Sequence, residues 1–172
     1  MKTLILGIGN PFLGDDGIGF HIAQELAREI RDENTDVKDT CVAGLNLLEL
    51  IAGYDKVIVI DAIMTKGGEV GEVCRLEPEN LVKTVHPTTS PHNASLASVI
   101  EIGRKFLAGQ MPGEIVVFAV NIQEVTEFSE EMTEKVKEAI PKVVNLVLEE
   151  LGTRLVGFEP TTLGSEDRCS IR

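Results

Sequence analysis

The amino-acid sequence predicts an α/β fold, in which a mostly parallel, twisted sheet is covered by helices on both faces. Residues 57–60 and 115–120 form continuous apolar runs rich in β-branched side chains, which is typical of strands buried on both faces. Stretches with apolar residues at helical spacing alternate with these strands. Because no repeat or linker divides the 172 residues, we expect a single domain with a substantial core.

The elements can be placed in order along the chain. We expect strands near residues 4–6, 37–42, 56–61, 72–76 and 114–120, and helices near residues 17–31, 45–51, 96–107 and 130–151, the last interrupted or bent near Pro141. These elements assign residues 1–152 to the domain. Residues 153–172 show neither the helical nor the strand period, so we expect a disordered or peripheral tail there.

Composition excludes several classes of function. The net charge is −12 and the isoelectric point is about 4.7, which argues against binding to nucleic acid or to an anionic membrane surface. Cys41, Cys74 and Cys169 form no Cys-x-x-Cys pattern, and packing explains Cys41 and Cys74 best. No apolar run approaches the roughly 20 residues of a membrane span. We therefore expect a cytoplasmic protein without nucleic-acid or membrane partners.

The first candidate functional segment follows the first strand. Gly7 and Gly9 permit a sharp turn, and further glycines surround Asp15 and Asp16 at the start of a helix, which leaves the two carboxylates accessible. Taken alone, either aspartate is also explained as a helix cap. A dinucleotide-binding turn is less well supported, because Phe12 stands where Gly-x-Gly-x-x-Gly needs its third glycine.

Two other segments carry chemistry that could join this loop. Asp61 follows a buried strand, and ligands of parallel sheets collect at the carboxyl ends of strands, so Asp16 and Asp61 are expected to meet at one edge. His92 precedes a helix that Ser90 or Asn93 could cap, and the positive helix end favours neutral imidazole. Two carboxylates and an imidazole suit a divalent ion such as zinc or nickel. A histidine in this setting can also be a simple loop or cap residue.

Three motifs, in order, resemble those of one enzyme family. They are Gly-x-Gly-Asn-x4-Asp-Asp-Gly-x-Gly at residues 7–19, Ile-Asp-Ala at residues 60–62, and Ser-Pro-His at residues 90–92. Over about residues 1–151 the chain resembles the nickel-iron hydrogenase maturation endopeptidases. Residues 39–44 depart from the glycine-rich turn that family members often carry there, which bears on the neighbouring substrate groove.

The resemblance implies a specific fold, site and reaction. The fold would be a single-domain three-layer α/β/α sandwich around a five-stranded sheet. The enzyme would remove a C-terminal extension from the precursor of a hydrogenase large subunit, with nickel carried by this substrate. Asp16, Asp61 and His92 would be the catalytic and metal-contacting residues, and the isolated protein could hold zinc or cadmium instead. Either the ion or a carboxylate would activate water.

Two other functions remain open from the residues alone. A peptidyl-tRNA hydrolase also begins with a strand and Gly-x-Gly-Asn-Pro, but it needs a catalytic histidine and asparagine near that turn and a basic face. A non-enzymatic ligand-binding or assembly module could use the glycine loop to hold a small anion. Asp15 and Asp16 beside the loop would repel phosphate, which disfavours the second alternative.

Overall fold

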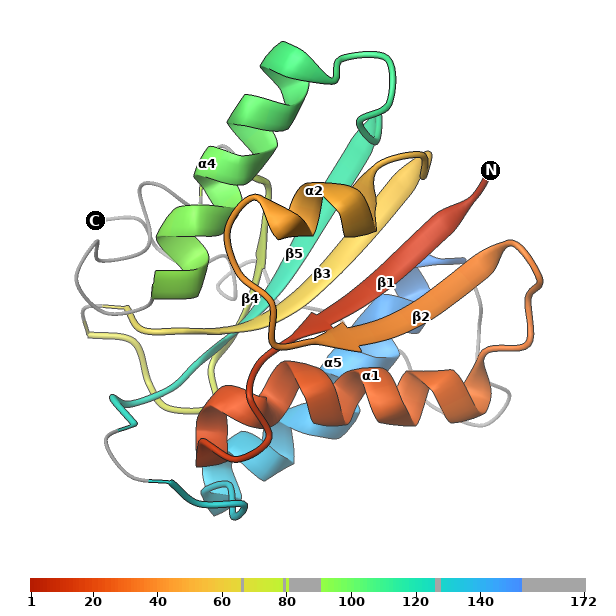
Figure 1. Cartoon of the computed structure of the whole chain (residues 1–172). Helices are drawn as coiled ribbons and strands as arrows, with labels where there is room; N and C mark the ends of the chain where they lie inside the picture. The colour runs from red at the N-terminus through yellow and green to blue at the C-terminus, as the bar shows by residue number, and fades with distance from the viewer. Residues whose placement is uncertain (66, 79, 81–90, 126–127, 153–172) are drawn as a thin grey trace.

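A computed structural model describes residues 1–65, 67–78, 80, 91–125 and 128–152. The expected tail at residues 153–172 lies outside this part of the chain. Five strands form one sheet in the order β2-β1-β3-β5-β4 (Figure 1). They are β1 (Thr3–Ile8), β2 (Thr35–Thr40), β3 (Lys56–Ile63), β4 (Val73–Leu76) and β5 (Glu114–Asn121). Neighbouring strands are parallel except at one edge, where β4 runs antiparallel to β5.

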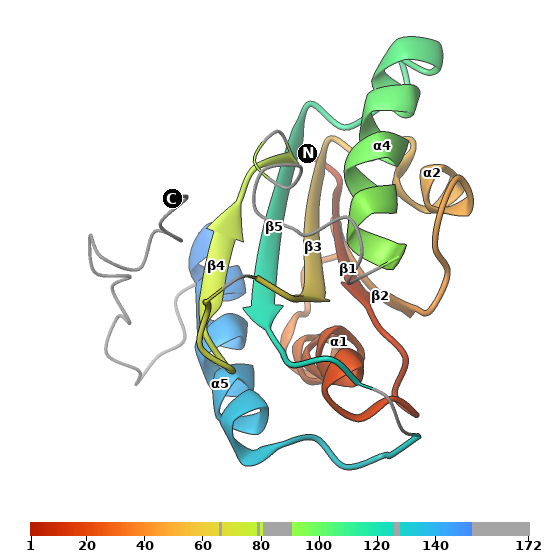
Figure 2. The same ribbon diagram turned by 90° about the vertical axis from the view of Figure 1, so that its left-hand side faces the viewer.

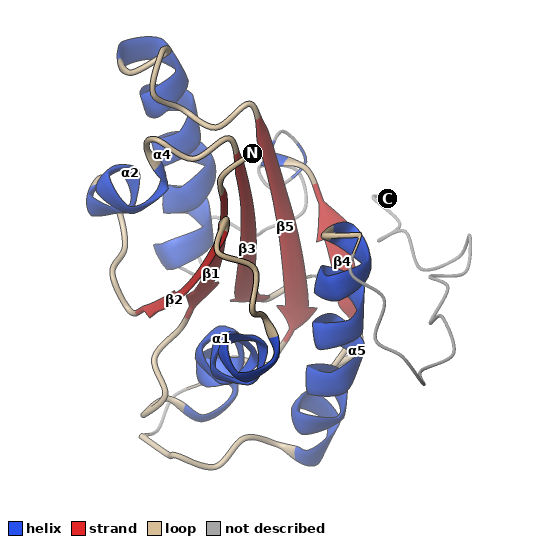
Figure 3. Cartoon of the chain, turned by 90° about the vertical axis from the view of Figure 1, so that its right-hand side faces the viewer, coloured by secondary structure: helices blue, strands red, loops and turns tan. Residues whose placement is uncertain are grey.

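Helices cover both faces of this sheet, which confirms the expected three-layer sandwich (Figures 2 and 3). The helices are the 3-10 turn η1 (Gly14–Gly17), α1 (Ile18–Glu29), α2 (Asn46–Ile51), α4 (Pro91–Phe106) and α5 (Glu134–Glu150). α1 and α5 pack together on one face, and α2 and α4 pack together on the other. Among the described helices, none has the length and apolar composition needed to span a membrane.

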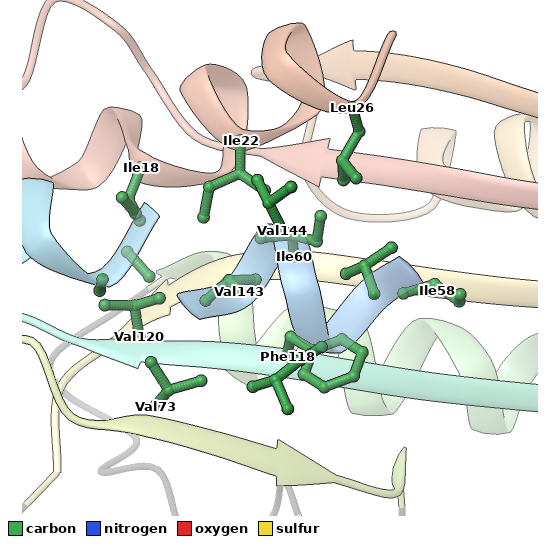
Figure 4. Close-up of a cluster of buried hydrophobic side chains, with 14 of the residues drawn as sticks. Ile18, Ile22, Leu26, Ile58, Ile60, Val73, Phe118, Val120, Val143 and Val144 are labelled. Atoms are coloured by element: carbon green, nitrogen blue, oxygen red, sulfur yellow. The ribbon is translucent and has the colours of Figure 1, made fainter. Parts of the chain in front are cut away.

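The sheet divides the core into two clusters. Strand β3 contributes to both, because its alternate side chains point to opposite faces. Val57, Val59 and Ile63 pack in the cluster under α2 and α4. Ile58 and Ile60 pack in the cluster under α1 and α5, with Phe118 of β5 (Figure 4). All eight residues of β3 are buried, as the continuous apolar run predicts.

The boundaries of several elements differ from those expected. β2 begins and ends two residues earlier, because its register with β1 pairs Thr35 with Thr3 and Thr40 with Ile8. α5 begins at Glu134 and continues through Pro141 without interruption. A proline removes only one helical N–H, and the buried face of this helix outweighs that loss.

Two interpretations of single residues are also corrected. Gly7 lies inside β1 rather than in a turn, and a Cβ at this position would overlap the carbonyl oxygen of Gly19 in α1. Its function is therefore close packing of helix against strand. Cys74 is buried as expected, whereas Cys41 is exposed in the loop after β2, so core packing does not explain it.

A network of ion pairs connects the C-terminal end of α5 to strands β3, β4 and β5. The Nζ of Lys56, a side chain only 8% exposed, lies 2.8 Å from Glu150 and 2.9 Å from Glu114. Arg75 lies 3.0 Å from the same Glu150 carboxylate. Burial by itself raises the pKa of Glu150, but hydrogen bonds from Arg75 and Lys56 outweigh it, and the pKa lies below its ordinary value.

We expect Glu150→Gln to lower the free energy of unfolding by about 2 kcal/mol at pH 7, because it leaves Lys56 and Arg75 short of their shared partner. A carboxyl with a lowered folded-state pKa stabilises the protein above its unfolded pKa, about 4.3, and this contribution is lost as pH falls through the folded value. Urea denaturation at pH 7 and pH 3 measures both effects.

Glu134→Gln in the same helix is the matched control. Glu134 pairs with Lys137 at the surface, and its side chain is 83% exposed, so the loss should stay below about 0.5 kcal/mol. If the Glu150 and Glu134 variants are equally stable, the network does not contribute as described.

Candidate active site

Three segments that carry the predicted site residues reach the carboxyl edge, the edge of the sheet at which the parallel strands end. The loop after β1 and the last residues of β3 lie there (Figure 1). α4 runs back toward the opposite edge, where the loop after it bonds to Asp55 before β3. The first turn of α4 therefore also lies on the side of the carboxyl edge (Figure 2).

Asp16 is half-buried in η1 and fixes the shape of the loop that precedes it. Its Oδ2 accepts a hydrogen bond of 2.9 Å from the backbone N–H of Asn10, and the Asn10 side-chain oxygen accepts one of 3.0 Å from the N–H of Phe12. A Cβ at Gly9 would overlap the carbonyl oxygen of Asp16, so glycine is needed for this close approach. The loop thus holds the Asp16 carboxylate in one position.

Asp61 lies two residues before the end of β3, which continues to Ile63 rather than ending at the aspartate. By alternation its side chain faces the layer of α2 and α4. It is only 2% exposed. Oδ1 accepts a hydrogen bond of 2.8 Å from the N–H of Ala62, whereas Oδ2 has no hydrogen-bond partner within the described part of the chain.

The environment of Asp61 disfavours its charged form. Burial raises the pKa of this carboxyl well above its ordinary value, and the negative charge of Asp16 raises it further. The hydrogen bond from Ala62 acts in the opposite direction and is outweighed. The structure therefore brings Asp16 and Asp61 close enough to repel each other, as expected for two carboxylates at one edge.

His92 lies in the first turn of α4, which begins at Pro91. Proline is favoured at this position because its missing N–H would have no helical partner. Asn93 lies inside the helix, so it is not the cap suggested by the sequence, and Ser90 lies outside the described residues. The side chains of residues 91–95 also lie outside them, so only the backbone position of His92 is established.

Asp15 has a structural partner that the sequence did not indicate. Its buried carboxylate accepts hydrogen bonds from the backbone N–H of Thr133, at 2.6 Å, and from the Thr133 hydroxyl, at 3.0 Å. Thr133 is the residue before α5, and no side-chain cap is formed at the start of η1 or α1. Asp15 therefore joins the candidate loop to α5, and neither aspartate caps the helix that it precedes.

The described side chains include no group of three or more histidines, cysteines, aspartates or glutamates placed to hold a metal. They do provide two carboxylates, one of them with an unpartnered buried oxygen. This pair fits a divalent cation. The positive charge would offset the repulsion between the two carboxylates, and the ion would give the unpartnered Asp61 oxygen a ligand contact. A third ligand would have to come from elsewhere, and the predicted one is His92.

Comparison with known proteins identifies the class and the family. The family model "hydrogenase maturation protease" matches residues 20–150, which include Asp61 and His92 and begin just after the loop of Asp16. Hydrogenase 2 maturation protease of Escherichia coli is 32% identical over 121 residues, covering 70% of this chain and 73% of that protein. A putative hydrogenase maturation protease of Methanocaldococcus jannaschii is 28% identical over 153 residues, covering 86% and 95%.

A solved structure agrees with these matches. The hydrogenase maturating endopeptidase HybD from E. coli superposes with a TM-score of 0.76 at 31% identity, covering 88% of this chain and 93% of that one. The fold and the matches define the chain as an endopeptidase, an enzyme that hydrolyses peptide bonds within a polypeptide. The chain belongs to the hydrogenase maturation protease family. The predicted family is confirmed, and neither the peptidyl-tRNA hydrolase nor the binding module is supported.

Proposed function

We propose that this endopeptidase removes a C-terminal extension from the precursor of a nickel-iron hydrogenase large subunit, and that it recognises the nickel already bound in that precursor through Asp16, Asp61 and His92. Membership of the hydrogenase maturation protease family supports the reaction. The observation that carries the nickel contact is the buried Asp61 carboxylate, which has one unpartnered oxygen and a second carboxylate beside it.

Each of the three residues suits this role in a different way. Asp61 is rigid, because it projects from the central strand of the sheet. Asp16 is held by the N–H of Asn10 through one oxygen, which leaves its other oxygen for a ligand. His92 lies in the first turn of α4, and a neutral imidazole can donate its lone pair to a cation.

The same residues can take part in the chemistry. Hydrolysis requires a water oxygen to attack the scissile carbonyl carbon, and a proton of that water must end on the departing nitrogen. The nickel of the substrate would supply Lewis acidity at this point. The carboxylate of Asp16 or Asp61, if it lies beside the attacking water, can accept the proton and return it to the leaving amine. An aspartate would then act as the base.

The pair should also bind a divalent ion in the isolated protein. Zinc and cadmium accept mixed carboxylate and imidazole ligands, so either could occupy the site when no substrate is present. Such an ion would compete with the nickel of the precursor for the same oxygen atoms. The nickel itself is part of the substrate and leaves with the processed subunit.

Cleavage of nickel-loaded and nickel-free precursor by the same enzyme preparation tests the proposal. We expect the loaded precursor to lose a short C-terminal peptide, detected by mass spectrometry, and the nickel-free precursor to be cleaved at least about 100-fold more slowly, because its scissile bond is not positioned. Reloading the second sample with nickel should restore cleavage. Equal rates for the two samples would show that nickel is not what the enzyme recognises.

A further inference from the structure

Two exposed phenylalanines flank a cleft beside the candidate active site. Phe12 is 58% exposed and Phe128 is 84% exposed. The cleft between their segments has a volume of about 420 Å³ and is lined by Asn10, Phe12, Phe128, Ser129 and Glu130. Large apolar side chains gathered at an exposed cleft are a mark of interaction sites. We call this feature the Phe12–Phe128 cleft.

The cleft is formed by two segments that are distant in sequence. Backbone hydrogen bonds connect them. The N–H of Ser129 donates to the carbonyl oxygen of Phe12 at 3.0 Å, and the N–H of Gly14 donates to the carbonyl oxygen of Ser129 at 2.5 Å. Asp15 and Thr133 add a further connection, so the loop after β1 lies along the segment before α5 (Figure 2). Backbone hydrogen bonds therefore hold together the two segments that carry the phenylalanines.

The cleft lies next to the loop that holds one of the candidate catalytic carboxylates, Asp16. Asn10 lines the cleft, and its backbone N–H donates to Asp16. Phe12 lies in the same turn and donates its own N–H to the Asn10 side chain. One residue that lines the cleft, Asn10, is therefore hydrogen-bonded to Asp16.

Charge indicates what kind of polypeptide fits. Residues 9–19 and 121–134 contain no lysine or arginine, but they contain several acidic residues. Glu130 lines the cleft itself, and Glu131 follows it at the surface. A partner must therefore combine an apolar side chain, which fits against the two phenylalanines, with a neighbouring positive charge.

We propose that the Phe12–Phe128 cleft binds a segment of the polypeptide substrate that presents an apolar side chain next to a lysine or arginine, and so places the scissile bond beside Asp16. The inference rests on the proposed function for the identity of the substrate. The two phenylalanines are residues for positioning and specificity, and they take no part in the bond-breaking step.

Steady-state cleavage of the nickel-loaded precursor tests this surface. We expect Phe12→Ser and Phe128→Ser each to raise KM about tenfold and to leave kcat within about twofold, since they weaken binding without touching the reacting atoms. Glu130→Lys should raise KM by a similar factor. Both phenylalanines are exposed, so the melting temperatures should match that of the wild type.

The chain offers matched controls at other places. Phe106, at the far end of α4, is 72% exposed, and Phe106→Ser should leave KM unchanged. Glu33, exposed in the loop before β2, gives the charge-reversal control Glu33→Lys. If the wild type cleaves the precursor and both phenylalanine variants have its KM, the cleft is not the docking surface, although the proposed function stands.

Two other results would also overturn the inference. Light scattering that shows a dimer in the wild type and a monomer in Phe12→Ser would make the cleft a contact between two copies of this chain. A wild type that neither cleaves nor binds the nickel-loaded precursor would overturn the proposed function and with it the substrate assigned to the cleft.

Discussion

Asp61→Asn is expected to lower kcat/KM for the nickel-loaded precursor by about 10²–10⁴-fold, because the amide neither binds a cation well nor accepts the proton of water. The fold should be preserved, since the asparagine oxygen can still accept the hydrogen bond from Ala62. The amide is neutral, so neither burial nor the negative charge of Asp16 disfavours it. Cleavage assays with a melting temperature on the same samples separate loss of chemistry from loss of structure.

Asp55→Asn is the matched control for this variant. It removes one negative charge at the opposite edge of the sheet, where Asp55 accepts a hydrogen bond from the N–H of Lys2. Activity should stay within twofold of the wild type. Asp16→Asn and His92→Ala should resemble Asp61→Asn in activity and in loss of zinc or cadmium binding by calorimetry. Cleavage by Asp61→Asn within tenfold of the wild-type rate would remove this residue from the mechanism.

Gly19→Ala is expected to destabilise the protein by about 3 kcal/mol or more. A Cβ at this position would overlap the carbonyl oxygens of Ile8 in β1 and Ile60 in β3, and neither backbone can move without distorting the sheet. α1 would have to shift away from both strands, and the loop that carries Asp16 would shift with it. Urea denaturation monitored by circular dichroism measures the loss.

Gly109→Ala is the control for a glycine that packs against nothing. A Cβ there has open space around it, so the substitution should be neutral or should stabilise by up to about 1 kcal/mol through the unfolded state. If both alanine variants are equally stable, the contact of α1 with β1 and β3 is not as close as the structure shows.

The sequence predicted the layers of the fold because the evidence for them is local. The continuous apolar runs in β3 and β5 and the helical spacing in α1 and α5 are properties of neighbouring residues, and each formed the expected element. The three motifs also identified the family, which the comparisons confirm. The predicted boundaries were wrong where pairing with another strand sets the end of an element. For example, the register with β1 ends β2 at Thr40.

The site depended much more on tertiary structure. That Asp16 raises the pKa of Asp61, that one oxygen of Asp61 lacks a partner, and that Asp15 holds Thr133 are all consequences of how distant segments pack. No spacing in the sequence encodes these contacts. The sequence gives one indication of the contact between Asp15 and Thr133. Thr133 directly precedes a helix, so the backbone N–H of Thr133 needs an acceptor from outside that helix.

By itself, the sequence determined which residues form strands and helices and to which family of endopeptidases the chain belongs. Only the tertiary structure decided which carboxylate is buried without a full set of partners, and which two phenylalanines flank a cleft next to the loop of Asp16. The physical reason is that periodicity along a chain reports the solvent exposure of each element, whereas the distance between side chains on different elements is set by register and packing.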